Sequence, residues 1–428
     1  MNGHEFAESA LAALSQRGFD KSQVSLVESE RHEIEAEANE MSLFRTTRNR
    51  QLGLTGIVGG RRGSVTLNKL DEAALSEGIE ELWQVSQGAE PDDANDIAPA
   101  QPQRSFSRGP DAPDYDAMYG RLAELLSYAH EQYPTLTVRS GVVAFVARTE
   151  HFLNSSGVDY TSTCSHYTGG AMVSAREDKH VASFNSCRFA SNDLSRPLHE
   201  CGTLDDVMRQ NVEQVVTEKI TQKFVGDLVV SPDCVLSLLS FLLMNLANAP
   251  LIAGTSVYKD KLGEVVAGEK LTLHSRPVSD EIAAGYFVTN DGFEAHDTTI
   301  VENGVLATYL LDLYGANKTG LARAETGGGC YVIEPGDSTY DEMVSHTDEG
   351  ILITRFSGGV PSQTGDFSGV AKNSYYISGG EIRHPVSETM IAGNLVDMWN
   401  SIEEISRERV DFGTQIMPWI RMSGVSVS

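Results

Sequence analysis

The chain has 428 residues, of which 40% are hydrophobic and 22% are charged, a composition typical of a folded globular protein. This length predicts two or three domains with a core large enough that folding needs no disulfide bonds. The 33 basic and 60 acidic residues give a net charge of −27. Because a surface this acidic repels phosphate backbones, we expect no direct contact with nucleic acid.

Five cysteines are scattered through the chain without a CxxC pair, namely Cys164, Cys187, Cys201, Cys234 and Cys330. Their odd number and wide spacing indicate reduced, buried thiols rather than a disulfide framework. The first residues also lack the basic start and the apolar run of an export signal. We therefore expect a cytoplasmic protein.

Residues 1–105 are expected to form an N-terminal domain of helices and strands. Apolar residues recur at helical spacing over 5–16, and Gly18 stands where that helix would end. The next segments predict three strand regions and a second helix with an apolar face, over 24–27, 32–38, 52–66 and 70–85. Five prolines within 88–114 predict an irregular linker that neither packs nor forms regular structure.

Residues 114–224 are expected to form a middle region. A helix over 114–133 is stopped by a proline, and alternating runs over 135–189 predict an antiparallel meander, which could instead belong to the first lobe. Thr203, with Asp206 three residues later, predicts the capped start of another helix. The apolar face of that helix would consist of Val207, Val212, Val215, Val216 and Ile220.

Residues 225–428 are expected to form a C-terminal antiparallel β domain. Residues 234–254 carry no charge and are long enough to cross a membrane, but their polar residues favour a buried core helix over a membrane span. Two β-hairpins are predicted, with turns at Asn303-Gly304 and Gly379-Gly380. The predicted fold class is therefore α+β, with an N-terminal α/β domain followed by a β-rich, barrel-like C-terminal domain that carries a buried helix.

The histidines do not form a local zinc motif. A helical zinc site needs two imidazoles within about one turn and a carboxylate that acts on the metal-bound water. The chain has 11 histidines, and the two that are closest in sequence, His166 and His180, are 14 residues apart. The sequence therefore predicts no catalytic residue and no metal ligand, and leaves open only a site assembled from distant side chains.

Other catalytic motifs are incomplete. Ser256-Val-Tyr-Lys259 and Lys318-Thr-Gly320 match two motifs of penicillin-recognising serine enzymes, but the Ser-x-Asn motif between them is missing. The chain also has no GxSxG elbow, no GxxxxGK[ST] phosphate loop and no GxGxxG after a strand. The motifs therefore support neither serine-based acyl transfer nor nucleotide chemistry.

Three strings in the chain are specific enough to indicate a family. Gly254-Thr-Ser256 is followed by Asp260-Lys-Leu-Gly-Glu264, residues 365–398 read GDFSGVAKNSYYISGGEIRHPVSETMIAGNLVDM, and LGLTGIVGGRRGSVTLNKLDEAALSEGIEEL begins at Leu52. Together these strings resemble the PmbA/TldD family of bacterial and archaeal proteins, and the resemblance runs over nearly the whole chain.

The resemblance implies a two-subunit cytoplasmic metallopeptidase in which only the TldD-type subunit carries the zinc motif HExxxH and a later cysteine ligand. That motif would fall within 240–249, which here reads SFLLMNLANA, and no cysteine follows Cys330. The chain therefore resembles the PmbA-type subunit, also called TldE, in a family with the older label modulator of DNA gyrase. The implied cofactor is zinc in a TldD-type partner, with none bound by this chain.

We therefore expect a non-catalytic subunit of a zinc metallopeptidase complex that proteolyses unfolded or extended peptides. Its expected partners are a TldD-type zinc subunit or a second copy of itself, and a peptide substrate whose main chain could pair with a strand edge. Candidate peptide or partner contacts are Gly254, Thr255, Ser256, Lys259, Gly359, Thr364 and Asp366.

Two other functions stay open at this level. One is a stand-alone homodimeric protein that binds peptides or acts as a scaffold without protease activity. The other is a hydrolase with a dispersed metal site. The mass in solution tests the first, and the zinc content of protein purified without chelator tests the second.

Overall fold

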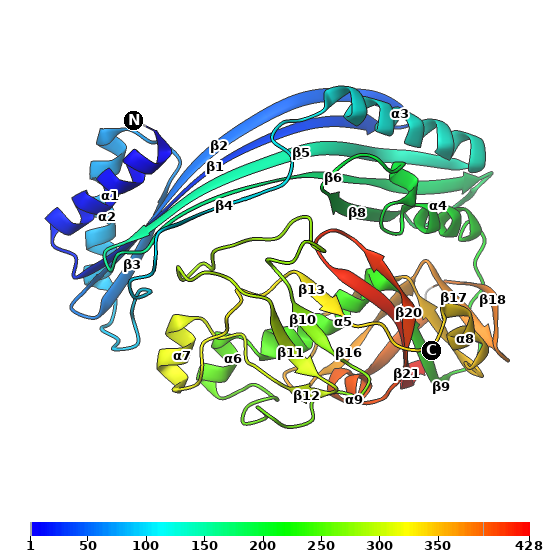
Figure 1. Cartoon of the computed structure of the whole chain (residues 1–428). Coiled ribbons are helices and arrows are strands. Elements are labelled where there is room, and N and C mark those ends of the chain that lie inside the picture. The colour runs from blue at the N-terminus through cyan, green and yellow to red at the C-terminus, as the bar shows by residue number, and fades with distance from the viewer. Residues whose placement is uncertain (1, 388) are drawn as a thin grey trace.

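Four long antiparallel strands form an arched sheet in the N-terminal half of the molecule (Figure 1). The computed structural model describes residues 2–387 and 389–428. The long strands are β1 (Lys21–Glu37), β2 (Glu40–Val58), β5 (Leu136–Asn154) and β6 (Asp159–Glu177). Within the described residues, an eight-stranded sheet is completed by β3 (Arg61–Leu67), β4 (Arg104–Arg108), β7 (His180–Val181) and β8 (Asn185–Ser191).

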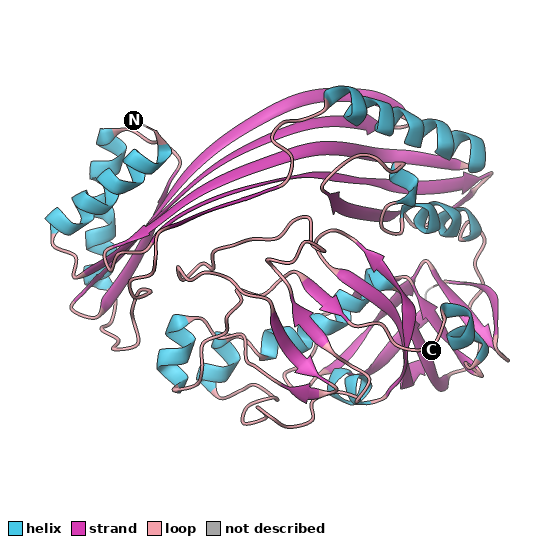
Figure 2. Ribbon diagram, in the orientation of Figure 1, coloured by secondary structure: helices cyan, strands magenta, loops and turns pink. Residues whose placement is uncertain are grey.

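Helices cover the two ends of the arch and leave its middle bare (Figure 2). At one end, α1 (Gly3–Arg17) and α2 (Glu72–Gly88) pack against β1, β2 and β3, and at the other end α3 (Tyr115–Gln132) packs on β1 and β5. The first turns are capped by the side chains of Asn2, Asp71 and Asp114. Gly18 ends α1 with a φ of 102°, a conformation that glycine adopts without a steric penalty. These three helices confirm the sequence predictions.

β1 is one continuous strand, whereas the sequence predicted two short strands over 24–27 and 32–38. The charged residues between the two predicted strands stay in the ladder because they pair with charges on the neighbouring strand. Glu30, for example, accepts a hydrogen bond of 2.8 Å from Arg48 on β2. A β-strand with both faces in solvent shows no hydrophobic alternation, which is the pattern that the sequence analysis relied on.

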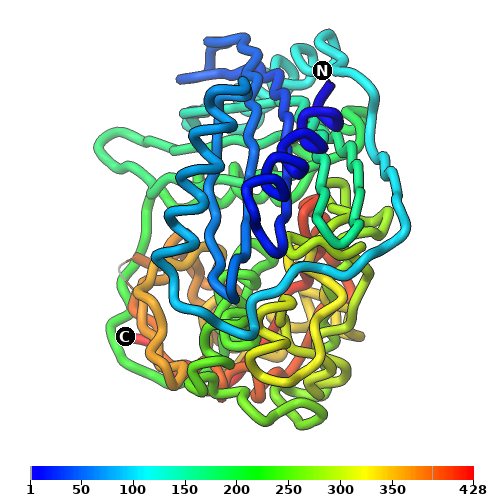
Figure 3. Tube along the Cα trace, turned by 90° about the vertical axis from the view of Figure 1, so that its left-hand side faces the viewer, coloured from blue at the N-terminus to red at the C-terminus, as the bar shows by residue number. Residues whose placement is uncertain are grey.

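Segments 1–105 and 114–224 contribute strands to the same sheet, because β1 pairs with β5 from Gln23 to Glu37. The linker between them is mostly irregular, but the prediction that it neither packs nor forms regular structure is wrong, since Ile97 and Ala98 are buried and one segment is a strand. Its proline-free part forms β4, which pairs in parallel with β6. Figure 3 shows this linker crossing the molecule against the C-terminal lobe, where Asp92 accepts a hydrogen bond of 2.9 Å from the hydroxyl of Tyr314.

α4 (Leu204–Glu213) begins where the sequence predicted it, but without the predicted capping box. The Thr203 hydroxyl instead donates a hydrogen bond of 2.6 Å to the carboxylate of Asp233, and it accepts none from the backbone of the first turn. The helix ends at Glu213, so the predicted apolar face is too long, and Val216 is 60% exposed. A short 3₁₀ turn, η1 (Leu198–Glu200), precedes this helix.

The C-terminal half forms a compact lobe under the arch (Figure 1). Among the described residues its sheet has 13 strands, with the main order β12-β11-β10-β13-β21-β9-β14-β17-β18. Two pairs are parallel, β9 with β14 and β13 with β21, and the other pairs are antiparallel. The strands are β9 (Phe224–Val230), β10 (Leu273–Ser275), β11 (Thr298–Glu302), β12 (Val305–Leu306), β13 (Tyr331–Ile333), β14 (Glu349–Ile353), β15 (Arg355–Gly358), β16 (Asp366–Lys372), β17 (Ser374–Ser378), β18 (Glu381–Val386), β19 (Thr389–Asn394), β20 (Ile402–Asp411) and β21 (Ile416–Val427).

Both predicted hairpins are confirmed. β11 and β12 are joined by Asn303 and Gly304, whose φ angles of 48° and 80° are those of the tight turn that an Asn-Gly pair favours. β17 and β18 are joined in the same way by Gly379 and Gly380.

The first part of the apolar segment forms α5 (Pro232–Asn245), the predicted core helix of the C-terminal lobe. The prediction of one helix over the whole segment is wrong, because the backbone is extended at Ala247 and a separate short helix follows. Leu239 and Leu242 are fully buried, and the Trp399 indole donates a hydrogen bond to the carbonyl of Leu238. Among the described residues, no helix combines the length and hydropathy required to cross a bilayer. The remaining helices are α6 (Asn248–Ala253), α7 (Leu313–Thr319), α8 (Tyr340–Ser345) and α9 (Leu395–Asn400).

Candidate functional site

One narrow face of α5 is not covered by the rest of the lobe. Ser237 is exposed, Ser240 is partly exposed and Met244 is 63% exposed, while the leucines on the other faces are buried. These three positions are three and four residues apart, so they lie above one another on the helix. The Ser240 hydroxyl donates a hydrogen bond of 2.7 Å to the carbonyl of Ser237. The uncovered face therefore lies in the segment where the family resemblance places the zinc motif.

A hollow of about 460 Å³ lies beside this face. Its walls come from α5, from β15 with the turn that follows it, and from the starts of β16 and α9. The lining residues are Ser237, Leu238, Ser240, Phe356, Ser357, Gly358, Gly359, Pro361, Phe367 and Leu395. The hollow thus combines serine hydroxyls with apolar and aromatic walls, a combination suited to an extended organic ligand.

The predicted turn residues lie at this hollow, but only one of them lines it. Gly359 is exposed and faces open space. Asp366 accepts hydrogen bonds from the hydroxyl of Thr364 at 2.8 Å and from the side-chain amide of Asn394 at 3.0 Å. The Asn394 amide and the Thr364 hydroxyl hold the pKa of Asp366 below its usual value. Thr364 and Asp366 therefore shape the turn that presents Gly359.

The predicted loop after α6 has one buried and several exposed members. Gly254 ends α6 with a φ of 70°, and Thr255 and Lys259 are exposed. Ser256 is buried, and its hydroxyl donates a hydrogen bond of 2.7 Å to the carbonyl of Asn245, the last residue of α5. The Ser256 hydroxyl therefore holds the loop on the end of the helix. No backbone hydrogen bond joins the described residues of this loop to those of the turn at 359–366.

The site offers poor ligands for a metal. Zinc takes thiolate, imidazole or carboxylate ligands, whereas the uncovered face of α5 carries two hydroxyls and a thioether. Across residues 2–387 and 389–428, no group of three or more His, Cys, Asp or Glu side chains is arranged to hold a metal ion. The described side chains therefore do not fit a zinc ion held by this chain alone.

Sequence reasoning missed the other lining residues of the hollow, in particular Ser237, Phe356 and Phe367. Two serines three residues apart in an apolar helix were a usable signal for an uncovered face. The two phenylalanines, whose ring centroids are 5.8 Å apart, come from different strands and meet only in the folded sheet.

The fold of the whole chain, an arched sheet over a β-rich lobe with one core helix, is found in solved structures. The structure of TldE from Thermococcus kodakarensis superposes with a TM-score of 0.84 at 20% identity and covers 99% of this chain and 100% of that one. A putative modulator of DNA gyrase from Bacteroides thetaiotaomicron superposes with a TM-score of 0.85 at 23% identity and covers 99% and 98% of the two chains. These likenesses establish the fold.

Sequence comparison identifies the family. The model of the PmbA/TldA metallopeptidase C-terminal domain matches residues 223–428, and the model of the PmbA/TldA metallopeptidase domain 1 matches residues 23–86. Metalloprotease PmbA of Escherichia coli O157:H7 is 25% identical over 407 residues, 87% of this chain and 85% of that protein. The Metalloprotease PmbA homolog of Haemophilus influenzae is 24% identical over 426 residues, 91% and 89% of the two chains. The chain belongs to the PmbA/TldD metallopeptidase family.

Proposed function

We propose that this chain is the non-catalytic, PmbA-type subunit of a cytoplasmic two-subunit zinc metallopeptidase that cleaves unfolded or extended peptides. One observation carries the proposal. The uncovered face of α5 presents Ser240 and Met244, side chains that neither hold zinc nor act as a base on its water. A likeness to a chain named TldE and to proteins named PmbA supports the same assignment.

In this proposal the zinc ion is held by a TldD-type partner, and the described residues of this chain help to enclose the peptide. The hollow beside α5 is open to a ligand, and both the turn with Gly359 and the exposed part of the 254–259 loop are free to contact peptide or partner. The proposed contact residues are Gly254, Thr255, Lys259, Gly359, Thr364 and Asp366, and the buried Ser256 contributes by holding the loop on the end of α5. Free thiols at all five cysteines are consistent with a reducing compartment.

The proposal is tested by mixing the full chain with a purified TldD-type subunit and an unfolded peptide. We expect the chain alone to contain no stoichiometric zinc and to leave the peptide intact. The mixture is expected to show the mass of a complex in light scattering and to cleave the peptide. A TldD-type subunit without this chain is the reference for the gain in cleavage.

A matched pair of variants tests whether the α5 face is used. Met244→Lys places a charge on the uncovered face, and we expect cleavage by the complex to fall about tenfold or more. Met390→Lys makes the same change at a residue of β19 that is 39% exposed, and it should have no effect. Equal cleavage with both variants would show that the α5 face takes no part.

Two outcomes would overturn the proposal. Stoichiometric zinc and cleavage by this chain alone would establish an independent hydrolase. A stable homodimer that binds the peptide but forms no complex with the TldD-type subunit would establish the stand-alone binding protein instead.

A further inference from the structure

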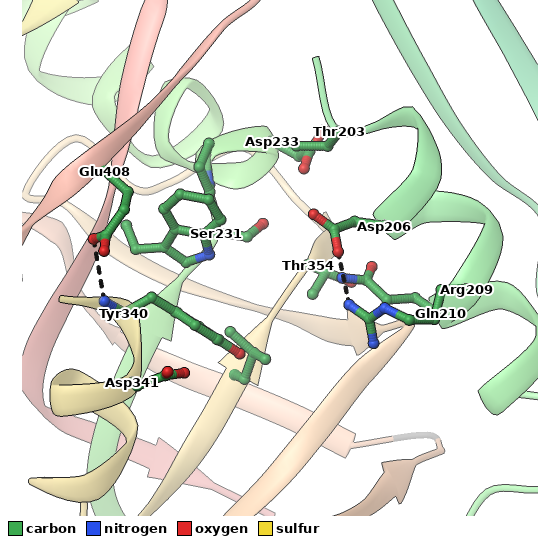
Figure 4. A pocket seen from close by; sticks show the side chains of 13 residues that line it. Thr203, Asp206, Arg209, Gln210, Ser231, Asp233, Tyr340, Asp341, Thr354 and Glu408 are labelled. Atoms are coloured by element: carbon green, nitrogen blue, oxygen red, sulfur yellow. Dashed lines mark hydrogen bonds and ion pairs between the residues drawn. The ribbon is translucent and has the colours of Figure 1, made fainter. Parts of the chain in front are cut away.

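A second cavity lies at the other end of α5, where α4 of the arch meets the C-terminal lobe (Figure 4). Its volume is about 350 Å³, and it shares no lining residue with the hollow beside the uncovered face of α5. Its lining residues are Thr203, Asp206, Arg209, Gln210, Ser231, Pro232, Asp233, Tyr340, Asp341, Leu352, Thr354, Glu408 and Trp419. Because both lobes contribute walls, the cavity exists only when the lobes are docked.

Ser231 lines this cavity, and its hydroxyl does not cap the helix that begins there. It occupies the position before the first turn of α5, where a serine hydroxyl normally accepts a hydrogen bond from the helix backbone. Here the backbone N–H groups of Cys234 and Val235 donate to the carbonyl of Ser231, and the hydroxyl makes no capping hydrogen bond. The residue is only 4% exposed, and its hydroxyl has no nitrogen or oxygen partner among the described residues. The thiol of Cys234 nearby is only a weak acceptor.

Figure 4 shows the Ser231 hydroxyl directed toward the side of the cavity where Asp206 lies. A buried hydroxyl without a partner is less stable than one that is hydrogen-bonded. A ligand that supplied the missing hydrogen bond would recover that stability. The unused hydroxyl is therefore the feature of this cavity that points to a ligand.

The charge of the cavity indicates what kind of ligand fits. Asp233 is hydrogen-bonded by Thr203 but has no cationic partner among the described residues. Burial raises the pKa of Asp233 to about 6, and the nearby charge of Asp206 acts in the same direction. The one guanidinium of the wall, Arg209, is already held by Asp206 at 2.7 Å and by Glu213 at 2.9 Å. The cavity thus lacks a positive charge next to a buried carboxylate.

Aromatic rings and two further carboxylates complete the wall. Tyr340 and Trp419 lie side by side with ring centroids 5.5 Å apart, and an ammonium group is attracted to the face of such rings. Asp341 and Glu408 add negative charge on the same side. Since the described carboxylates are not grouped closely enough to hold a metal ion, an organic cation with several N–H donors fits better than a bare cation.

The cavity adjoins a further hollow of about 450 Å³, which is distinct from the hollow beside the uncovered face of α5. The two share Arg209, Gln210, Tyr340 and Leu352, and the second hollow continues along β17 and β18. A ligand whose ammonium group occupies the first cavity therefore has room for an extended chain in the second.

We propose that this cavity between the lobes binds the terminal ammonium group of an extended amine, with Asp233 as its counter-charge and Ser231 as a hydrogen-bond acceptor. Two sources share this chemistry, the free N-terminus of a short peptide and an aliphatic diamine. Binding at this cavity does not require a zinc subunit. An experiment can therefore disprove this proposal without disproving the proposed function, and the reverse also holds.

The experiment is a calorimetric titration of the full chain at pH 7.5 with three probes: triglycine, N-acetyl-triglycine and 1,4-diaminobutane. We expect saturable binding, at one site per chain, of at least one of the two probes with a free aliphatic amine. Binding of triglycine alone identifies a peptide N-terminus, and binding of the diamine alone identifies a free amine. N-acetyl-triglycine, which lacks the ammonium group, should not bind.

Variants connect the binding to the named residues. Asp233→Asn is expected to weaken binding about tenfold or more, and Ser231→Ala by about threefold, because the first loses an ion pair between two charged groups and the second a hydrogen bond in which only the donor is charged. Asp397→Asn is the matched control, since Asp397 also lies in the first turn of a helix, α9, but is exposed. Thermal unfolding of each variant shows that it is folded.

Three results would overturn the proposal. The first is the absence of saturable binding by either amine up to about 10 mM, a concentration at which only binding weaker than about 3 kcal/mol stays undetected. The second is equal binding of N-acetyl-triglycine. The third is equal affinity of Asp233→Asn and Asp397→Asn. Ser231→Ala retains every charge, so it tests the site even if Asp233→Asn does not fold.

Discussion

Ion pairs between carboxylates and guanidinium groups occur in both lobes, and the Arg48 pair of the arch and the Arg421 pairs of the C-terminal lobe differ in burial. On β2 the Arg48 side chain is 75% exposed where it binds Glu30 at 2.8 Å. In the C-terminal lobe the Arg421 side chain is 14% exposed and donates to Glu404 at 2.6 Å and to Asp227 at 2.7 Å. Solvent and salt screen the first kind of pair, whereas the loss of one partner from the second leaves a desolvated charge.

This difference indicates how each lobe is stabilised. In the middle of the arch, we expect the charge pairs to fix the strand register and to add little to the stability. The stability of the arch is expected to come from the helices packed at its two ends. The C-terminal lobe depends on side chains that are buried around α5 and β21. We therefore expect substitutions in the C-terminal lobe to have larger effects than comparable substitutions in the arch.

The largest expected effect is that of Trp399→Ala. The Trp399 indole is 1% exposed, and it joins α9 to α5 through its hydrogen bond to the Leu238 carbonyl. Removing a buried ring of this size should lower the free energy of unfolding by about 3–5 kcal/mol, measured by urea titration.

Trp83→Ala is the control in the arch. Trp83 is partly buried. Its ring centroid lies 5.2 Å from that of Phe19, and the guanidinium carbon of Arg17 lies 3.9 Å from the Trp83 ring centroid. We expect its loss to cost about 1–2 kcal/mol, since less apolar area leaves the core. An equal loss of stability in the two variants would contradict the contrast between the lobes.

A pH effect of about 3 kcal/mol is expected from Glu404. Hydrogen bonds from Ser338, His346 and Arg421 outweigh the effect of burial and lower the pKa of Glu404 to about 2, against 4.5 for a free glutamate. Because the folded-state pKa is the lower one, the stabilisation is fully present above about pH 4.5 and is lost as the pH falls toward 2.

The measurement is the difference in unfolding free energy between wild type and Glu404→Gln at several pH values. We expect a constant difference from pH 7.5 to 5 and a decreasing one below pH 4.5. A difference that does not change with pH would show that Glu404 titrates normally.

Asp233 should shift stability in the opposite direction, by about 3 kcal/mol or less. Its pKa is raised to about 6 by burial, against 3.8 for a free aspartate. Because the folded-state pKa is the higher one, stability is greatest below about pH 4 and is lost as the pH rises through 6.

Asp233→Asn removes this titration. We expect the variant to be more stable than wild type in urea titrations at pH 7.5 and not at pH 4. Lower stability of the variant at both values would mean that the carboxylate has a purely structural role.

The smallest expected effect is that of Arg48→Ala. An exposed pair of this kind contributes less than about 1 kcal/mol at low salt, and the contribution should vanish in 1 M NaCl, where the screening length is about 3 Å. A loss of more than 2 kcal/mol would show that the middle of the arch depends on its charges for stability.

Part of the candidate site was visible in the sequence. The uncharged segment that became α5, and the absence of His and Glu within it, follow directly from the residue types. Gly359 was also placed correctly at a surface turn. The hollow beside Gly359 was not predictable, because α5 forms one wall and the other walls come from β15, β16 and α9, which follow much later in the chain.

The sequence by itself determined the elements whose causes are local. Side-chain caps and helical periodicity specify α1, α2 and α3, and the turn residues at 303–304 and 379–380 specify the two hairpins, because these interactions span only a few residues. The tertiary structure alone decided that β1 pairs with β5, that β4 adds to β6, and that Ser231 and Asp233 face a cavity between the lobes. Strand pairing and burial depend on partners more than 50 residues away, and residue types do not identify those partners.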